Sequence, residues 1–156
     1  MSAVVQTPEL WVRPMQDSDL DDVMRVELSV YGFPWTRRIF EDCLRVGYHC
    51  HVGEVAGDFA GYGIMSTGAN EAHILNLCVS PHYQRHGLGR KLMSVLLAEA
   101  HQRDVRDVFL EVRPSNTAAL ALYEQMGFNQ VGARKNYYPT QQGREDAVIL
   151  AASLDF

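Results

Sequence analysis

The chain has 156 residues, of which 47% are hydrophobic and 21% charged. This length fits one domain and leaves no room for two catalytic domains, and the composition excludes disordered and collagen-like chains. With 14 basic and 19 acidic residues the formal charge is −5. An acidic chain argues against nucleic acid as a direct partner and leaves attraction to a basic partner open.

The apolar residues show no pattern of a membrane or export segment. Continuous apolar runs such as Ala147–Ala152 are far shorter than the roughly 18 residues that a membrane helix needs. Residues 1–14 lack both the basic and the apolar region of a secretory signal. The cysteines are odd in number, have no CxxC spacing and are expected to be buried thiols in a reducing compartment: Cys43, Cys50 and Cys78. We therefore expect a cytoplasmic protein without a membrane span.

The first half of the chain predicts a strand, two helices and three further strands. Ser18 and Asp21 have capping-box spacing, so a helix should run from there to about Val30. Three-four spacing assigns its buried face to Leu20, Val23, Met24 and Leu28. Thr36 should cap a second helix that ends at Arg45 and turns inward Ile39, Phe40, Cys43 and Leu44. The expected strands are Leu10–Arg13, Tyr48–Glu54, Phe59–Ser66 and Ala72–Val79, the middle two as a hairpin.

The second half begins with a glycine-rich turn and an amphipathic helix that ends near Arg103. A strand is expected at Val108–Val112 and a helix at Thr117–Met126, stopped by the glycine that follows. The closing strands are expected at Phe128–Arg134 and Ala147–Leu154. This order of elements predicts an α/β architecture with a mixed sheet and helices on its faces.

The glycine turn is a candidate anion site. Gly87 and Gly89 lie between a strand and a helix, where unpaired N–H groups meet the positive end of the helix dipole. Nearby cations add positive charge, namely Arg85, His86, Arg90 and Lys91, and a pyrophosphate would suit such a turn. Leu92 stands where a dinucleotide fingerprint needs glycine and a triphosphatase loop needs serine or threonine. Alone, the turn fits an ordinary helix start equally well.

The neighbouring residues make the turn more specific. Gln84–Gly89 resembles the Gln/Arg-x-x-Gly-x-Gly/Ala signature of the GNAT family of N-acetyltransferases. Three further segments resemble the bacterial members that acetylate a ribosomal-protein alanine: Glu-Val-Arg at 111–113, Asn-Tyr-Tyr-Pro at 136–139 and Gly-Arg-Glu-Asp at 143–146. The resemblance covers nearly the whole chain and implies one acetyltransferase domain over residues 1–156, with a mixed, mostly antiparallel sheet.

The resemblance also implies a set of site residues. Acetyl-CoA would lie along Leu77, Cys78 and Val79, with its pyrophosphate at the backbone of Arg85, His86, Gly87, Leu88, Gly89 and Arg90. Asn116 would also contact this donor. Glu111 would accept a proton from the attacking amine and Tyr123 would donate one to the leaving thiolate. No metal is implied.

The resemblance further implies that the acceptor is the N-terminal alanine of a small-subunit ribosomal protein. At pH 7, an α-amine of pKa about 7.7 costs about 1 kcal/mol to deprotonate, whereas a lysine of pKa about 10.4 costs about 4.6 kcal/mol. Aromatic side chains in two segments are candidates for the walls of a peptide groove: Phe33, Trp35, Tyr137 and Tyr138. An acidic enzyme also suits a basic ribosomal substrate.

Other interpretations remain open at this point. Glu111 would be unremarkable if it faced solvent or paired with Arg113, and Tyr123 if it were only a core aromatic. Cys78 is a less favoured nucleophile, and His49 with His51 is a less favoured metal pair. The acceptor alternatives are a lysine side chain, another protein N-terminus and a small amine, and a non-catalytic acetyl-CoA-binding module is a further alternative. The sequence does not indicate an oligomeric state.

Overall fold

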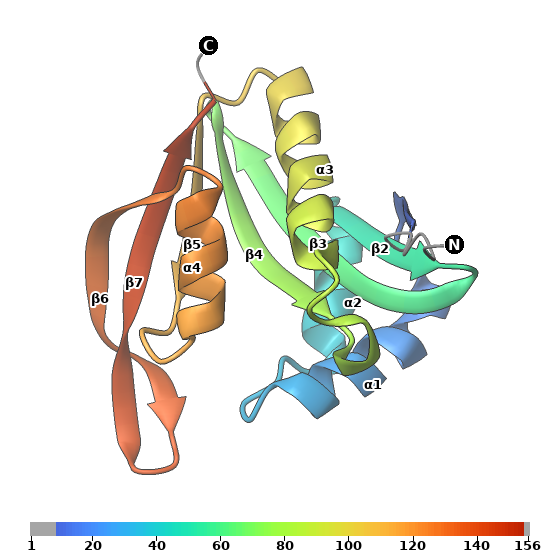
Figure 1. Ribbon diagram of the computed structural model, residues 1–156, viewed down its shortest axis with the longest axis horizontal. Coiled ribbons are helices and arrows are strands. Elements are labelled where there is room, and N and C mark those ends of the chain that lie inside the picture. Colours follow the sequence, from blue (N-terminus) through green and yellow to red (C-terminus); the bar gives the residue numbers. More distant parts are fainter. Residues whose placement is uncertain (1–8, 155–156) are drawn as a thin grey trace, which may run out of the picture. The chain divides into compact units, whose positions relative to one another are not determined.

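The computed structural model describes residues 9–154 and has the predicted order of helices and strands (Figure 1). The helices are α1 (Leu20–Val30), α2 (Arg37–Arg45), α3 (Leu88–Gln102) and α4 (Thr117–Gln125). The strands are β1 (Leu10–Pro14), β2 (His49–Val55), β3 (Asp58–Gly68), β4 (Glu71–Val79), β5 (Asp107–Val112), β6 (Asn129–Thr140) and β7 (Gly143–Ser153). Two 3-10 turns that the sequence did not predict are Asp17–Asp19 and Pro81–Tyr83.

The strands form a mixed sheet in the order β1-β2-β3-β4-β5-β7-β6. β4 and β5 pair in parallel, whereas β1–β2, β5–β7 and β6–β7 are antiparallel. The predicted fold class, a mostly antiparallel mixed sheet flanked by helices, is therefore confirmed. No helix in the described part of the chain is both long and apolar enough to cross a bilayer.

The described residues divide into two compact units. The first comprises the residues up to Gly63 together with Leu77–Met93, and the second comprises Ile64–Asn76 and the residues from Ser94 onward. The division falls within β3, β4 and α3, so each unit contains part of these elements. One domain over residues 1–156 stays a prediction.

The buried face of α1 differs from the prediction at its C-terminal end. Leu20 and Val23 are buried as expected, but Leu28 is exposed and Glu27 is buried in its place. The three-four spacing assigned every position by hydrophobicity, and Glu27 breaks that rule because its carboxylate has hydrogen-bond partners. In α2, Phe40 and Cys43 are buried as predicted, whereas Ile39 is exposed. The Thr36 cap is confirmed, since its side chain accepts from the Ile39 N–H.

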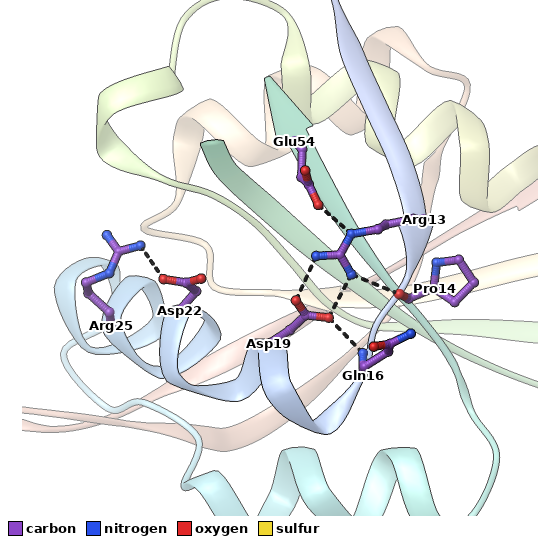
Figure 2. Close-up of polar contacts among 7 residues, drawn as sticks. All are labelled: Arg13, Pro14, Gln16, Asp19, Asp22, Arg25 and Glu54. Carbon is purple, nitrogen blue, oxygen red and sulfur yellow. Dashed lines mark hydrogen bonds and ion pairs between the residues drawn. The ribbon is translucent and has the colours of Figure 1, made fainter. Parts of the chain in front are cut away.

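An ion-pair cluster fixes the start of α1 (Figure 2). The Asp19 carboxylate accepts from Arg13 Nη1 at 2.8 Å and Nη2 at 2.7 Å, and from the Gln16 N–H at 2.8 Å. Arg13 Nε also donates to Glu54 of β2. The capping box predicted for Ser18 and Asp21 is therefore wrong, because Asp19 and not Asp21 accepts from the N–H group that precedes the helix.

We expect Asp19→Asn to lower the free energy of unfolding at pH 7 by about 1.5–3 kcal/mol, the usual range for hydrogen bonds to charged groups. The side chain is only 10% exposed, and the Arg13 hydrogen bonds hold the pKa of this carboxyl below its ordinary value. A depressed folded-state pKa gives stability that is present above the unfolded-state pKa, about 3.9, and is lost as the pH falls through the folded-state pKa. Urea unfolding at pH 7 and at several values below pH 4 measures both effects.

The matched control is Asp22→Asn, because the ion pair that Asp22 makes with Arg25 at 2.9 Å is exposed (Figure 2). Such pairs contribute about 0–1 kcal/mol. The Asp19 variant should also lose part of the acid sensitivity of the parent protein. Equal stability losses in the two variants, or an unchanged pH dependence in Asp19→Asn, would contradict this account of the cluster.

A glycine in β3 allows its backbone to approach β4 closely. A Cβ added at Gly61 would lie 2.5 Å from the Cys78 carbonyl oxygen and 3.2 Å from the Val79 Cα. Both neighbours are backbone atoms, so a side chain at Gly61 would force the strands apart. Glycine at this position therefore places the end of β4 where it is.

We expect Gly61→Ala to lower the free energy of unfolding by about 1–3 kcal/mol, the usual cost of overpacking. Gly68→Ala is the control, because a Cβ there meets nothing within 4 Å. Chemical unfolding of both variants measures the difference, and a Gly61→Ala protein as stable as the control would show that the strands separate without cost.

The hairpin of β6 and β7 is longer than predicted, and Figure 1 shows the two strands running together to their turn. Its outer part lacks alternating apolar residues and is held by polar contacts instead. Asp146 accepts from the Asn136 N–H at 2.9 Å, and Arg144 Nε donates to the Asn136 carbonyl at 2.7 Å. A register shift between Arg134 and Tyr138 accompanies a φ of +52° at Asn136. Tyr137 and Tyr138 consequently lie within β6, whereas the predicted strand ended at Arg134.

Candidate active site

The glycine turn has the backbone shape of an anion site. Arg85 and Gly87 adopt φ values of +69° and +75°, and α3 begins immediately afterward at Leu88. Leu88 is buried and anchors the helix start. The first turn of α3 contains no acidic residue, so nothing on the helix itself opposes a negative ligand at the positive end of its dipole. These residues therefore fit a phosphate group.

The turn is tied to the end of β4. Gln84 Nε2 donates to the Val79 carbonyl at 3.0 Å, and the Ser80 N–H donates to the Ala60 carbonyl at 2.7 Å. The end of β4, which contains Leu77, Cys78 and Val79, is thus connected to the turn by hydrogen bonds, and the backbone that follows it is held by β3. The turn and the start of α3 carry three exposed basic side chains, those of Arg85, His86 and Arg90. Their contact with acetyl-CoA stays a prediction.

Cys78 has the surroundings of a structural thiol. It is buried, and burial raises the pKa of its thiol to about 11, although hydrogen bonds with Tyr62 and Tyr31 act in the opposite direction. At neutral pH the thiol is protonated, whereas the reactive form of cysteine is the thiolate. This environment argues against the covalent alternative.

Glu111 lies at the point where the pairing of β4 and β5 ends. The parallel register runs from Glu71–Asp107 to Ile74–Leu110, and Glu111 is the next residue of β5. Its neighbours Leu110 and Val112 point to the buried face, so the Glu111 side chain lies on the other face of the strand, where it is 25% exposed. It accepts from Arg134 Nε at 2.9 Å. The carboxylate is thus ionically paired while remaining partly open to solvent.

Two tyrosines of β6 gather near this carboxylate. Partial burial, a hydrogen bond to Glu111 and the charge of Glu111 raise the pKa of Tyr137. Burial and the same charge raise the pKa of Tyr138 to about 12. The two rings meet edge to face with centroids 4.9 Å apart. Both hydroxyls therefore remain protonated at neutral pH and can donate hydrogen bonds.

Arg113 forms an ion pair with Glu145 and not with Glu111, the partner considered from the sequence. Its Nη1 donates to Glu145 Oε1 at 2.9 Å and to the Pro139 carbonyl at 2.9 Å. The guanidinium also lies 4.4 Å above the Tyr138 ring. The alternative that Glu111 pairs with Arg113 is therefore wrong, since Glu111 pairs with Arg134 on β6. Arg113 instead ties β5 to the outer hairpin that carries Tyr138.

Tyr123 and Asn116 belong to α4. Tyr123 is half-buried, its ring lies 5.9 Å from that of Phe128, and it makes a small contribution to the raised pKa of Tyr138. The structure thus places it near the tyrosines of β6 without excluding a packing role. Asn116 Oδ1 accepts from the Ala119 N–H at 3.2 Å and caps α4. Their functional roles stay predictions.

Phe33 and Trp35 lie in the connection between α1 and α2, within the first unit. Phe33 is 47% exposed, whereas the Trp35 ring packs on Phe40 with centroids 5.2 Å apart. Tyr137 and Tyr138 belong to the second unit. A groove shared by these four aromatic residues stays a prediction. Within residues 9–154, no three His, Cys, Asp or Glu side chains are grouped closely enough to bind a metal ion.

Comparison with known proteins identifies the family. Residues 13–128 match the acetyltransferase (GNAT) family. The chain belongs to this family. The match spans most of the described residues and includes the glycine turn, Glu111 and Tyr123.

Individual GNAT relatives match almost the whole chain. The [ribosomal protein bS18]-alanine N-acetyltransferase of Escherichia coli (strain K12) is 40% identical over 140 residues, which are 90% of this chain and 95% of the relative. The enzyme of the same name from Haemophilus ducreyi is 33% identical over 92% of this chain and 99% of its own. The crystal structure of the Escherichia coli ribosomal-protein-S18-alanine N-acetyltransferase superposes with a TM-score of 0.89 at 38% identity, covering 95% of this chain and 96% of that one.

Two charged residues that have specific partners in the structure, Arg134 and Glu27, were not predicted from the sequence. Arg134 reaches Glu111 across 23 positions of the chain, and no local spacing indicates such a pair. Glu27 could have been recognised from its position in the sequence, although a search for apolar residues alone passes over it. It stands seven residues after Leu20 on the buried face of α1, where a lone acid requires partners.

Proposed function

We propose that this GNAT enzyme transfers the acetyl group of acetyl-CoA to the N-terminal alanine of a small-subunit ribosomal protein. The observation that carries the proposal is the 40% identity, over nearly the full length of both chains, with an enzyme named for ribosomal protein bS18. The acidic charge of −5 suits a basic ribosomal partner. Such a substrate places the reaction in the cytoplasm.

In this proposal most of the residues that hold the donor belong to the first unit. Acetyl-CoA supplies an acetyl thioester and a pyrophosphate when bound. The amides of the turn from Arg85 to Arg90 bind the pyrophosphate, because they lie at the start of α3, whose first turn contains no acidic residue. The backbone of Leu77–Val79 lies alongside the pantetheine arm, and Asn116 makes a further contact. No metal takes part.

The acid–base residues belong to the second unit. Glu111 accepts a proton from the acceptor amine, directly or through one water, as the amine nitrogen bonds to the acetyl carbon. The carbon–sulfur bond breaks, and Tyr123 donates its proton to the departing thiolate. Proton transfer from a phenol of pKa about 10 to a thiolate whose conjugate acid has a pKa near 8.5 is unfavourable by only about 2 kcal/mol, so the step is accessible. No acyl-enzyme is formed, in agreement with the protonated state of Cys78.

The environment of Glu111 supports its role as a proton acceptor. Arg134 and Tyr137 both contact the carboxylate and orient it. Its partial exposure leaves room for an incoming amine. The acceptor ammonium ion is a cation like the Arg134 guanidinium, so the same carboxylate can bind it before the proton moves.

The test compares four acceptors at saturating acetyl-CoA: an alanine-started bS18 peptide, the same peptide with a blocked N-terminus, a lysine peptide and spermidine. Release of free thiol gives the rate, and peptide mass spectrometry gives the acetylated position. The alanine-started peptide is expected to have the highest kcat/KM, and the blocked peptide none. A higher kcat/KM for lysine or spermidine would overturn the acceptor. Calorimetric binding of acetyl-CoA without thiol release from any acceptor would favour a non-catalytic module.

A further inference from the structure

A buried carboxylate in the first unit takes no part in the reaction described above. Glu27 lies in α1 and is 2% exposed. Its Oε1 accepts from the Tyr62 hydroxyl at 2.6 Å, and its Oε2 accepts from the Trp35 N–H at 2.8 Å. Burying a charged group is costly unless hydrogen bonds compensate it, so this arrangement is expected to serve a purpose.

The two donors come from different parts of the fold. Tyr62 lies on β3, in the sheet, whereas Trp35 ends the loop of residues 31–35 between α1 and α2. Glu27 therefore joins helix, sheet and loop through a single side chain. Aromatic contacts also connect the two donor residues. Trp35 packs on Phe40, and Phe40 and Tyr62 meet edge to face with centroids 5.7 Å apart.

The other end of the loop is anchored as well. The Tyr31 hydroxyl donates to the Leu77 carbonyl of β4 at 3.3 Å. Leu77 begins the β4 segment assigned above to the acetyl donor. Between the two anchors, Phe33 is 47% exposed. The loop thus presents an aromatic side chain to solvent while both of its ends are fixed, which is the arrangement of a preorganised binding loop.

We propose that Glu27 is a positioning residue that holds the 31–35 loop in the conformation that binds the acceptor peptide. The inference rests on the proposed function, because it takes this loop as one wall of the acceptor groove. Glu27 does not contact the reacting atoms: it is buried and its oxygens bind Tyr62 and Trp35. Its effect is on acceptor binding, since a loop that must be ordered during binding lowers affinity.

Two variants loosen the loop with little change in shape. Tyr62→Phe removes only the hydroxyl, which orients Glu27 and also contacts the Cys78 thiol. Glu27→Gln replaces one acceptor oxygen by a donor group, so its side chain cannot accept from both Tyr62 and Trp35 as Glu27 does. Each variant is expected to raise KM for the alanine-started peptide about tenfold, while kcat and KM for acetyl-CoA stay within about twofold. The matched controls are Tyr48→Phe and Glu41→Gln, at exposed positions, which should leave all three constants unchanged.

The pattern of constants separates positioning from a loss of folded protein. Partial unfolding lowers the active concentration, and hence the apparent kcat, without changing KM. The double variant adds a second criterion, because two groups that act through one contact should raise KM no more together than the larger single effect. Urea unfolding of each variant identifies any that fails to fold, and Tyr62→Phe, which retains the Trp35–Glu27 bond, then decides the question alone.

The outcomes also separate this inference from the proposed function. No acetylation of the alanine peptide by the unmodified enzyme would contradict the proposed function itself. An active enzyme whose Tyr62→Phe and Glu27→Gln variants keep the original acceptor KM would overturn the role of Glu27. An equal rise in KM for acetyl-CoA, or additive effects in the double variant, would overturn it too, because the contact would then act on the fold as a whole.

Discussion

Glu111→Gln is expected to lower kcat for the alanine-started peptide by about 10²–10⁴-fold, the usual contribution of a general base. Glutamine has nearly the same shape but cannot accept the proton of the attacking amine at neutral pH. Acetyl-CoA affinity and the free energy of unfolding should change little, since the lost Arg134 pair is partly exposed and such pairs are weak. Steady-state kinetics, calorimetry with acetyl-CoA and urea unfolding test the three parts of this expectation.

The Arg134→Gln variant separates the carboxylate from its ion pair. It removes the 2.9 Å contact and leaves the proton acceptor in place. If Glu111 acts as the base, this variant should retain most of the kcat that Glu111→Gln loses. Equal losses in the two variants would mean that the ion pair, and not proton transfer, is what the reaction needs. A Glu111→Gln enzyme of undiminished kcat would reject the base assignment outright.

Tyr123→Phe is expected to lower kcat by about 10²-fold, the lower end of the range for acid–base catalysis. The variant keeps the ring that packs on Phe128, so stability should be almost unchanged. A stability loss with normal kcat would instead identify Tyr123 as a core residue, which its half-buried position on α4 also permits. Parallel measurement of kcat and of the urea unfolding midpoint distinguishes the two roles.

The leaving group provides an independent check of the same assignment. An acetyl donor whose thiol is more acidic than that of coenzyme A needs less help from a proton donor. The difference in kcat between Tyr123→Phe and the unmodified enzyme should therefore shrink with such a donor. A difference that is independent of thiol acidity would contradict proton donation by Tyr123.

The sequence predicted the order of elements because local patterns determine most of it. The Thr36 cap, the alternation in β5 and the glycine turn before α3 each depend on residues a few positions apart. Hydrophobic periodicity is strong evidence for such elements. It is weaker evidence for their ends, and the outer part of the β6–β7 hairpin was missed because polar side chains replace apolar alternation there.

The contacts that shape the candidate site depend on residues far apart in the chain. Glu111 and Arg134, Arg113 and Glu145, and Glu27 and Tyr62 are separated by 23, 32 and 35 positions. No spacing rule links such pairs, so the sequence named Glu111 but offered only the nearby Arg113 as an alternative partner. Arg13 and Asp19 are only six positions apart, but they lie in β1 and in the turn before α1, so no periodicity of a single helix or strand links them.

The central claim concerns what the enzyme modifies, and intact-mass spectrometry of ribosomal proteins tests it most directly. Small-subunit proteins would be compared between cells that contain this chain and cells from which its gene has been deleted. The account predicts that one protein with an N-terminal alanine loses one acetyl group in the deletion strain and regains it when the chain is restored. Unchanged acetylation of every alanine-started ribosomal protein would contradict the account.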